Sequence, residues 1–264
     1  MLTGLAGYWY DEDNRVVDYG TVKSILMQYD ELFVKKATDS WGGLGVHYYN
    51  KRNETIEELQ QNLQKIWGDL VIQECIRQSE EISRLNPSSV NTVRIMTHLM
   101  DDGTVKIRSS ILRMGAGGSK VDNASSGGIS TGIEDDGRLK AVAYSNTGVK
   151  YEEHPTTKIK FSDVVVPNFD KMRQMVKTLQ VKFPHFRLIS WDLAVNFDNE
   201  PMLIEANLCD GELDFHQLNN GPIFGKDTES VLKEVFGKER RKHSNRLVQC
   251  VDDIIGVILH EKRI

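Results

Sequence analysis

Two carboxylates and one amide have a spacing that could hold a divalent cation. Asp192 lies in one apolar run, Glu205 and Asn207 lie in the next, and Asp198 and Asn199 stand between the runs. If that pair forms a two-residue hairpin turn, Asp192 stands opposite Glu205, on the face that also carries Asn207. Two like charges directly opposed on a sheet are unfavourable, so the pair indicates a bound cation. Such oxygen ligands suit Mg²⁺, which takes further ligands from substrate phosphates; the alternative is a surface hairpin whose acids are solvated.

The alternation of side chains along residues 188–196 and 202–207 predicts the two strands of this hairpin. One face of the first strand is apolar, formed by Ile189, Trp191, Leu193 and Val195. The other face carries Ser190, Asp192 and Ala194. The predicted cation site therefore lies on the face turned away from the apolar core.

A lysine and a glycine-rich loop near the N-terminus could bind phosphate oxygens. Residues 32–36 predict a strand that contains Lys35, and residues 37–46 predict a loop with Gly42, Gly43 and Gly45. Glycines let backbone amides approach phosphate oxygens and permit a positive φ. The spacing is not that of a P-loop, and taken alone the segment is more often an ordinary hairpin loop.

Further strands and helices are expected around these groups. Residues 70–76 predict a short buried strand, and residues 91–97 and 105–113 predict two strands joined by a turn at Asp101-Asp102-Gly103. Helices are expected over residues 54–67, capped by Asn53, and from Pro167 to about Leu179. Arg94 and Arg113 lie within the predicted strands, where an arginine is usually on the solvated face.

The hairpin resembles a known superfamily. An aspartate followed thirteen residues later by Glu-x-Asn, here Asp192, Glu205 and Asn207, is similar to the metal-binding hairpin of ATP-grasp proteins. The surrounding sequence more closely resembles the sugar-transfer-associated branch, over about Leu32 to Gly225. The resemblance implies an α+β ATP-grasp fold: two lobes with antiparallel sheets and flanking helices, and the nucleotide in the cleft between them. It also implies ATP and two Mg²⁺ ions as cofactors.

The resemblance implies a role for individual residues as well. The implied metal ligands are Asp192, Glu205 and Asn207. The implied nucleotide contacts are Lys35, Gly42, Gly43, Gly45, Glu74, the backbone at Ile76, and either Glu80 or Glu81 at the ribose. The implied catalytic residues, which clamp the triphosphate or the developing acyl-phosphate, are Arg94 and Arg113, with Lys106 and Arg108 as secondary candidates. A guanidinium fork fits such oxygens bidentately.

By resemblance the chain is expected to be a ligase that joins a small-molecule carboxylate to an amine or thiol through an acyl-phosphate. The branch implies a place in cell-surface or exported polysaccharide synthesis. Many ATP-grasp ligases carry an arginine two residues before the metal-binding aspartate, whereas this chain has Ser190. Two alternatives therefore stay open: a kinase that phosphorylates a hydroxyl, and a nucleotide-binding subunit that needs a partner.

We expect three parts: a short N-terminal segment over residues 1–30, an ATP-grasp domain over residues 31–225, and C-terminal helices packed on it over residues 226–264. ATP-grasp enzymes usually carry a preceding α/β domain, which thirty residues cannot supply. The resemblance thus implies a possible partner subunit that supplies it.

Composition is that of an ordinary globular protein. Of its 264 residues, 39% are hydrophobic and 27% charged, and the net charge is −5, which argues against nucleic acid as the main partner. No apolar run reaches membrane-spanning length, and residues 1–7 do not form a signal peptide. The three cysteines follow no zinc or disulfide pattern, so a cytoplasmic location is expected.

Overall fold

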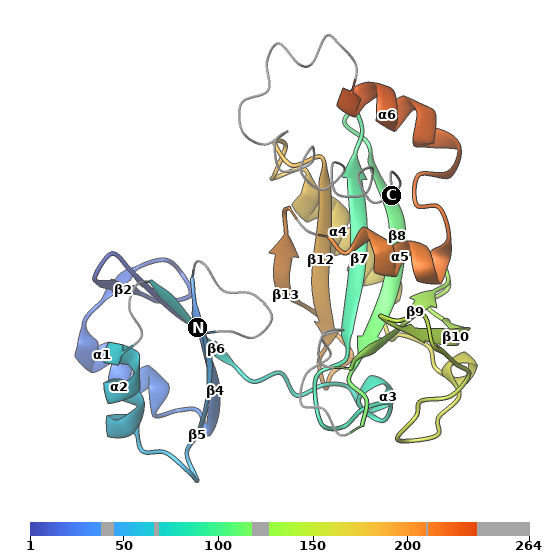
Figure 1. Cartoon of the computed structure of the whole chain (residues 1–264). Helices are drawn as coiled ribbons and strands as arrows, with labels where there is room; N and C mark the ends of the chain where they lie inside the picture. The colour runs from blue at the N-terminus through green and yellow to red at the C-terminus, as the bar shows by residue number, and fades with distance from the viewer. Residues whose placement is uncertain (38–44, 66–68, 118–126, 210, 237–264) are drawn as a thin grey trace, which may run out of the picture. The chain divides into compact units, whose positions relative to one another are not determined.

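The computed structural model describes residues 1–37, 45–65, 69–117, 127–209 and 211–236 (Figure 1). These residues fall into two compact units, Met1–Arg77 and Gln78–Ile264. Of the predicted glycine-rich loop, Gly42 and Gly43 lie outside the described residues. Each unit is built on one antiparallel sheet.

The first unit has a six-stranded sheet in the order β3-β2-β1-β6-β4-β5. Its elements in chain order are β1 (Leu2–Leu5), β2 (Tyr8–Tyr10), β3 (Val16–Val17), α1 (Tyr19–Leu26), β4 (Glu31–Lys36), β5 (Val46–Asn50), α2 (Ile56–Lys65) and β6 (Leu70–Glu74). One sheet face packs on α1 and α2 through a core that contains Leu32, Val34, Leu59 and Ile72. The predicted strand over residues 70–76 ends two residues early, at Glu74.

Two details of this unit differ from expectation. Residues 1–30 contribute three strands and α1 to the same sheet and core, so no separate N-terminal segment ends at residue 30. The cap of α2 is Thr55, whose hydroxyl accepts a hydrogen bond from the Glu58 amide, while the Glu58 carboxylate accepts one from the Thr55 amide. The prediction of Asn53 was wrong because this reciprocal capping box satisfies two backbone donors at once.

The second unit has a seven-stranded sheet in the order β11-β10-β9-β8-β7-β12-β13. Its strands are β7 (Thr92–Leu99), β8 (Val105–Met114), β9 (Ile129–Ile133), β10 (Leu139–Ser145), β11 (Lys150–Tyr151), β12 (Leu188–Val195) and β13 (Pro201–Asn207). Its helices are α3 (Glu80–Ser83), η2 (Phe161–Asp163), α4 (Phe169–Gln180), α5 (Leu213–Asn220), η3 (Gly225–Asp227) and α6 (Thr228–Phe236).

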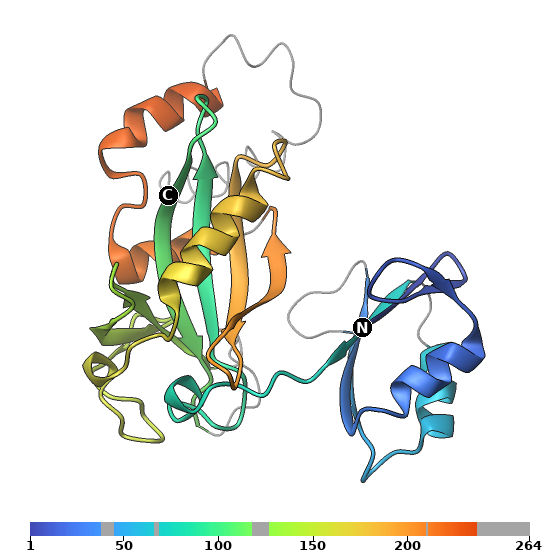
Figure 2. The same ribbon diagram turned by 180° about the vertical axis from the view of Figure 1, so that it is seen from behind.

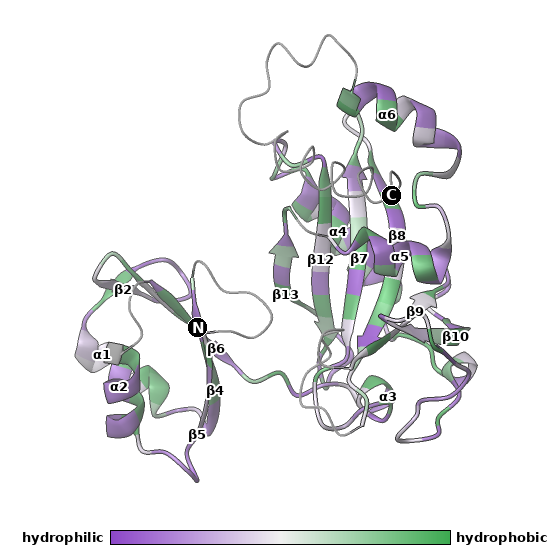
Figure 3. Ribbon diagram, in the orientation of Figure 1, coloured by the Kyte–Doolittle hydropathy of each residue, from purple (hydrophilic) through white to green (hydrophobic). Residues whose placement is uncertain are grey.

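The two faces of the second sheet differ in character. Helix α4 covers one face, as seen from behind in Figure 2, and packs Phe169, Met172 and Val176 against Trp191 and Leu193. Helix α5 crosses the opposite face, in front in Figure 1. Figure 3 shows both hydrophobic and hydrophilic bands along the central strands, as expected for a sheet with one apolar and one polar face.

The β12–β13 hairpin reaches the predicted register by an unexpected route. Asp192 does pair with Glu205, but Asn196 and Glu200 close a three-residue loop in which Asn199 has a φ of 63°. This loop is one residue longer than predicted. A bulge between Asp192 and Leu193 shifts the register back, so the two departures cancel at the carboxylates.

The predicted fold class is confirmed: both sheets are antiparallel, with helices at their flanks. Among the described residues, no helix has the length and apolar character needed to cross a membrane.

Candidate functional site

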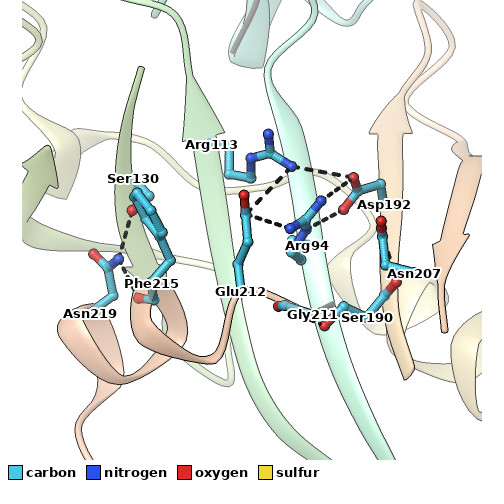
Figure 4. Close-up of polar contacts among 10 residues, drawn as sticks. All are labelled: Arg94, Arg113, Ser130, Ser190, Asp192, Asn207, Gly211, Glu212, Phe215 and Asn219. Atoms are coloured by element: carbon cyan, nitrogen blue, oxygen red, sulfur yellow. Dashed lines mark hydrogen bonds and ion pairs between the residues drawn. The ribbon is translucent and has the colours of Figure 1, made fainter. Parts of the chain in front are cut away.

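A buried network of four charges lies on the α5 face of the second sheet (Figure 4). Arg94 donates through Nε to Oδ1 of Asp192 and through Nη2 to Oδ2, both at 2.6 Å. The Nη1 atom of Arg113 lies 3.3 Å from Oδ2 of Asp192. Arg94 also donates to Glu212, and the Nη1 atom of Arg113 lies 3.9 Å from Oε2 of Glu212. Two guanidinium groups are thus paired with two carboxylates.

Strand register places this network. Asp192 on β12 pairs directly with Arg94 on β7. Arg113 on β8 pairs with Thr92, which lies two residues before Arg94 on β7. The side chains of Arg94, Arg113 and Asp192 are each 7% exposed or less. Burying an unpaired charge would be strongly unfavourable, so the arginines depend on the two acids. This reverses the usual position of a strand arginine on the solvated face.

The three predicted metal ligands lie on one sheet face. Glu205 is exposed and Asn207 is half-buried, with its Nδ2 atom donating to Ser190 O at 3.3 Å. The side-chain oxygens of Glu205 and Asn207 fit a hydrated Mg²⁺ ion. Asp192 fits less well in this arrangement, because arginines contact both its oxygens and their charges disfavour a cation. Among the described residues, no three His, Cys, Asp or Glu side chains form a metal-binding cluster.

In the first unit, Lys35 lies on the sheet face that the helices leave open. It is half-buried and pairs with Val46 and Val71 on the neighbouring strands. Phe33 lies on the same face, and the centre of its ring is 5.4 Å from the centre of the Tyr48 ring. This face combines a cation with aromatic surface, which is suited to phosphate and to a flat ring.

The other predicted nucleotide contacts in this region are dispersed. Gly45 has a φ of +76°, as predicted for a glycine-dependent turn. Glu74 is exposed at the end of β6, and the strand alternation puts its side chain on the helix-covered face, opposite Lys35. Ile76 is half-buried in the connection that follows.

Glu80 and Glu81 occupy the first turn of α3 in the second unit and differ in their partners. The carboxylate of Glu81 is held by Arg84 at 2.6 Å. Glu80 is exposed. Of the two acids, Glu80 has the more accessible carboxylate for a ribose.

The secondary candidates Lys106 and Arg108 do not join the Asp192 network. Lys106 and Arg108 both contact Oδ2 of Asp227, at 2.7 and 2.6 Å. These contacts hold the pKa of Asp227 low, at about 2. Arg108 also contacts Nδ1 of His98, whose pKa falls to about 4 because the ring is buried beside that cation. The cluster anchors η3 and α6 to the sheet.

Glu212, a member of the network, and His216, a neighbour of it, are not among the site residues that the sequence predicts. Glu212 precedes α5, and His216 lies within it, fully buried, with its Nδ1 atom 2.7 Å from Ser109 Oγ. Burial, together with the charges of Arg94 and Arg113, lowers the pKa of His216 to about 3. The ring is therefore neutral. The only sequence signal for Glu212 is its position just after the hairpin.

A cavity of about 470 Å³ lies elsewhere in the first unit, between β5 and α2. Its lining is polar and consists of His47, Tyr48, Asn50, Asn53, Glu54, Glu58, Gln61 and Asn62. It contains none of the predicted site residues, so cavity size alone does not locate them.

The model of a family described as sugar-transfer associated ATP-grasp matches residues 14–233. No curated protein sequence matches the chain.

Several solved structures resemble the chain. D-cycloserine synthetase DcsG is 14% identical with a TM-score of 0.46, over 81% of this chain and 59% of that one. D-alanyl-alanine synthetase A from Vibrio cholerae is 11% identical with a TM-score of 0.41, over 91% and 56%. N5-carboxyaminoimidazole synthetase from Staphylococcus aureus, complexed with ADP, is 9% identical with a TM-score of 0.40, over 72% and 37%. The chain thus spans less than two thirds of each of these proteins.

Proposed function

We propose, since the chain belongs to the sugar-transfer associated ATP-grasp family, that it is an ATP- and Mg²⁺-dependent ligase that activates a small-molecule carboxylate as an acyl-phosphate. An amine or a thiol then displaces phosphate. The family description suggests a role in building cell-surface or exported polysaccharide, with a uronic acid as one class of carboxylate. In this proposal the protein mainly positions the substrates and neutralises the negative charge of the phosphates.

The observation that carries the proposal is the buried pair of arginines beside the hairpin. Arg94 and Arg113 present guanidinium groups on the same sheet face as Glu205 and Asn207. Ser190 stands where many ATP-grasp ligases have an arginine, and Arg94 on the adjacent strand supplies that charge, because it pairs with Asp192. A fixed pair of positive charges would stabilise negative charge that develops on a reacting carboxyl and phosphoryl group.

Other residues take the roles expected from the family. Lys35 and the loop of Gly42, Gly43 and Gly45 would contact phosphate, the backbone at Ile76 would meet the adenine, and Glu80 would meet the ribose. The side chain of Glu74, which the resemblance also places at the adenine, lies on the sheet face opposite Lys35. Glu205 and Asn207 would hold Mg²⁺, whereas Asp192, the third ligand that the resemblance implies, is engaged by the two arginines in this structure. When bound, Mg²⁺ would neutralise charge on the triphosphate.

Trapping with hydroxylamine tests the reaction class. Purified protein receives Mg²⁺-ATP, hydroxylamine and a panel of carboxylic acids that includes uronic acids and amino acids. A ligase forms an acyl-phosphate, which hydroxylamine intercepts as a hydroxamate, with release of ADP and phosphate. ADP that accompanies a stable phosphoester and no hydroxamate would instead identify a kinase. ATP binding without turnover, relieved only by a second protein, would identify a nucleotide-binding subunit.

A further inference from the structure

The two carboxylates of the charge network are held in different ways. Asp192 projects from a central strand, is 5% exposed, and meets Arg94 with both oxygens. Glu212 reaches the arginines from outside the sheet and is 31% exposed. Its ion pairs to Arg94 and Arg113 both run through Oε2. Asp192 is therefore a fixed counterion, whereas solvent and solutes can reach Glu212.

The backbone directs the Glu212 side chain at the arginines. Glu212 has φ 52° and ψ 55°, a left-handed conformation that non-glycine residues seldom adopt. The preceding residue is fixed on the sheet, because Ser190 Oγ donates to Gly211 O at 3.1 Å. A Cβ at Gly211 would lie 2.6 Å from that hydroxyl oxygen, so only glycine permits this approach.

The Glu212 side chain is partly exposed to solvent where it meets the arginines. Rotation about its side-chain torsions would carry the carboxylate toward solvent. The two guanidinium groups would then keep their contacts with Asp192 and lose the carboxylate of Glu212. An incoming carboxylate could take the vacated place and use the guanidinium fork of Arg94.

We propose that Glu212 is a built-in occupant of the acceptor site: its carboxylate lies where the carboxyl group of the acceptor acid binds to Arg94 and Arg113, and the acceptor displaces it. This inference rests on the proposed ligase function and names the residues that recognise the carboxylate. A competitor inside the site lowers the apparent affinity by the fraction of molecules in which the site is free. An acid that fails to displace Glu212 would not reach the arginines.

Equilibrium binding without ATP tests the proposal independently of turnover. Titration calorimetry with glucuronate, acetate and inorganic phosphate is carried out on the wild type, Glu212→Gln and Asp214→Asn, at constant ionic strength. Asp214 is the matched control, because it is an exposed acid two residues away on α5. We expect Glu212→Gln to bind these carboxylates about tenfold tighter than the wild type, and Asp214→Asn to match the wild type.

The remaining outcomes are equally defined. Equal or weaker carboxylate binding by Glu212→Gln, or the same gain in Asp214→Asn, would overturn the proposal. A larger gain for inorganic phosphate than for either carboxylate would also overturn it, because the position would then suit a phosphoryl group. If Glu212→Gln does not fold, Glu212→Asp replaces it: the side chain is one methylene shorter, keeps its charge, and should give a smaller gain of the same sign. If Glu212→Gln binds carboxylates more tightly but the protein forms no hydroxamate, the ligase reaction is rejected and the displacement of Glu212 by a carboxylate still holds.

Discussion

At the scale of single residues, two acids with the same predicted role as metal ligands have different surroundings in the structure. Asp192 and Glu205 are directly paired across the hairpin, yet Asp192 is buried among arginines and Glu205 is exposed. A buried charge that loses its partner is costly, whereas an ion pair or hydrogen bond of an exposed charge contributes little. Their substitution should therefore affect different properties.

Asp192→Asn should lower the free energy of unfolding by ~3 kcal/mol, because Arg94 and Arg113 lose their shared counterion. Glu205→Gln should change that free energy by less than about 0.5 kcal/mol but should weaken Mg²⁺-dependent binding of ADP. Urea unfolding and titration calorimetry with and without Mg²⁺ provide the two readouts. If Asp192→Asn keeps wild-type stability and loses only the Mg²⁺ effect, Asp192 is a metal ligand and not an anchor for the arginines.

At the scale of elements, the cluster of His98, Arg108 and Asp227 ties the η3–α6 segment to strands β7 and β8. The Arg108 guanidinium lies 5.5 Å from the centre of the Phe224 ring, and the His98 ring lies 6.0 Å from it. The neutral form of His98 is required here, because its Nδ1 atom faces a guanidinium. Docking of this segment should therefore weaken in acid.

The pKa of His98 is about 4 in the folded protein, below the ordinary value of 6.5. Between these two pH values the histidine is protonated in the unfolded chain but not in the folded protein. The stability that neutral His98 contributes is therefore fully present above about pH 6.5 and is lost as the pH falls toward 4. Replacing His98 by Gln should reduce the slope of unfolding free energy against pH in this window by roughly 1 kcal/mol per pH unit. Acid titration of urea unfolding midpoints measures the slope. His185→Gln, at an exposed histidine, is the control, and an equal change there would contradict the assignment.

Strand alternation predicted much of the second sheet. The pairing of Asp192 with Glu205 and the β7–β8 hairpin with its Asp101-Asp102-Gly103 turn are confirmed. Strands β9 and β10 were not predicted, although Asp135-Asp136-Gly137 between them repeats the same turn signal. The loop and bulge of the β12–β13 hairpin could not be separated in advance, because each changes the register by one residue and their effects cancel.

The sequence could not predict which residues make up the charge network. Nothing local distinguishes a buried strand arginine from a solvated one, since burial depends on α5 crossing the same sheet face. Glu212 joins the arginines only through the path of the chain after the hairpin. The contacts of Lys106 and Arg108 with Asp227 likewise join residues 119 or more apart in sequence. Such pairings are set by tertiary packing and not by spacing.

At the scale of the whole molecule, the predicted site residues are divided between the two units. Lys35 and Gly45 belong to the first unit, and Arg94, Asp192 and Glu205 belong to the second. In the proposed reaction, Lys35 and Gly45 would contact phosphate, and the named residues of the second unit would bind the carboxyl group and Mg²⁺.

Transfer of a labelled oxygen tests the central claim most directly. Uronic and amino acids labelled with ¹⁸O in their carboxyl groups are mixed with the protein, Mg²⁺-ATP and hydroxylamine, and the released phosphate is analysed by mass spectrometry. Formation of an acyl-phosphate makes a carboxyl oxygen the bridge to phosphorus, and displacement by hydroxylamine leaves that oxygen on phosphate. We predict one ¹⁸O atom in each phosphate released during turnover. ADP and phosphate released without ¹⁸O, or label retained in a stable phosphoester of the acid, would contradict activation of a carboxylate.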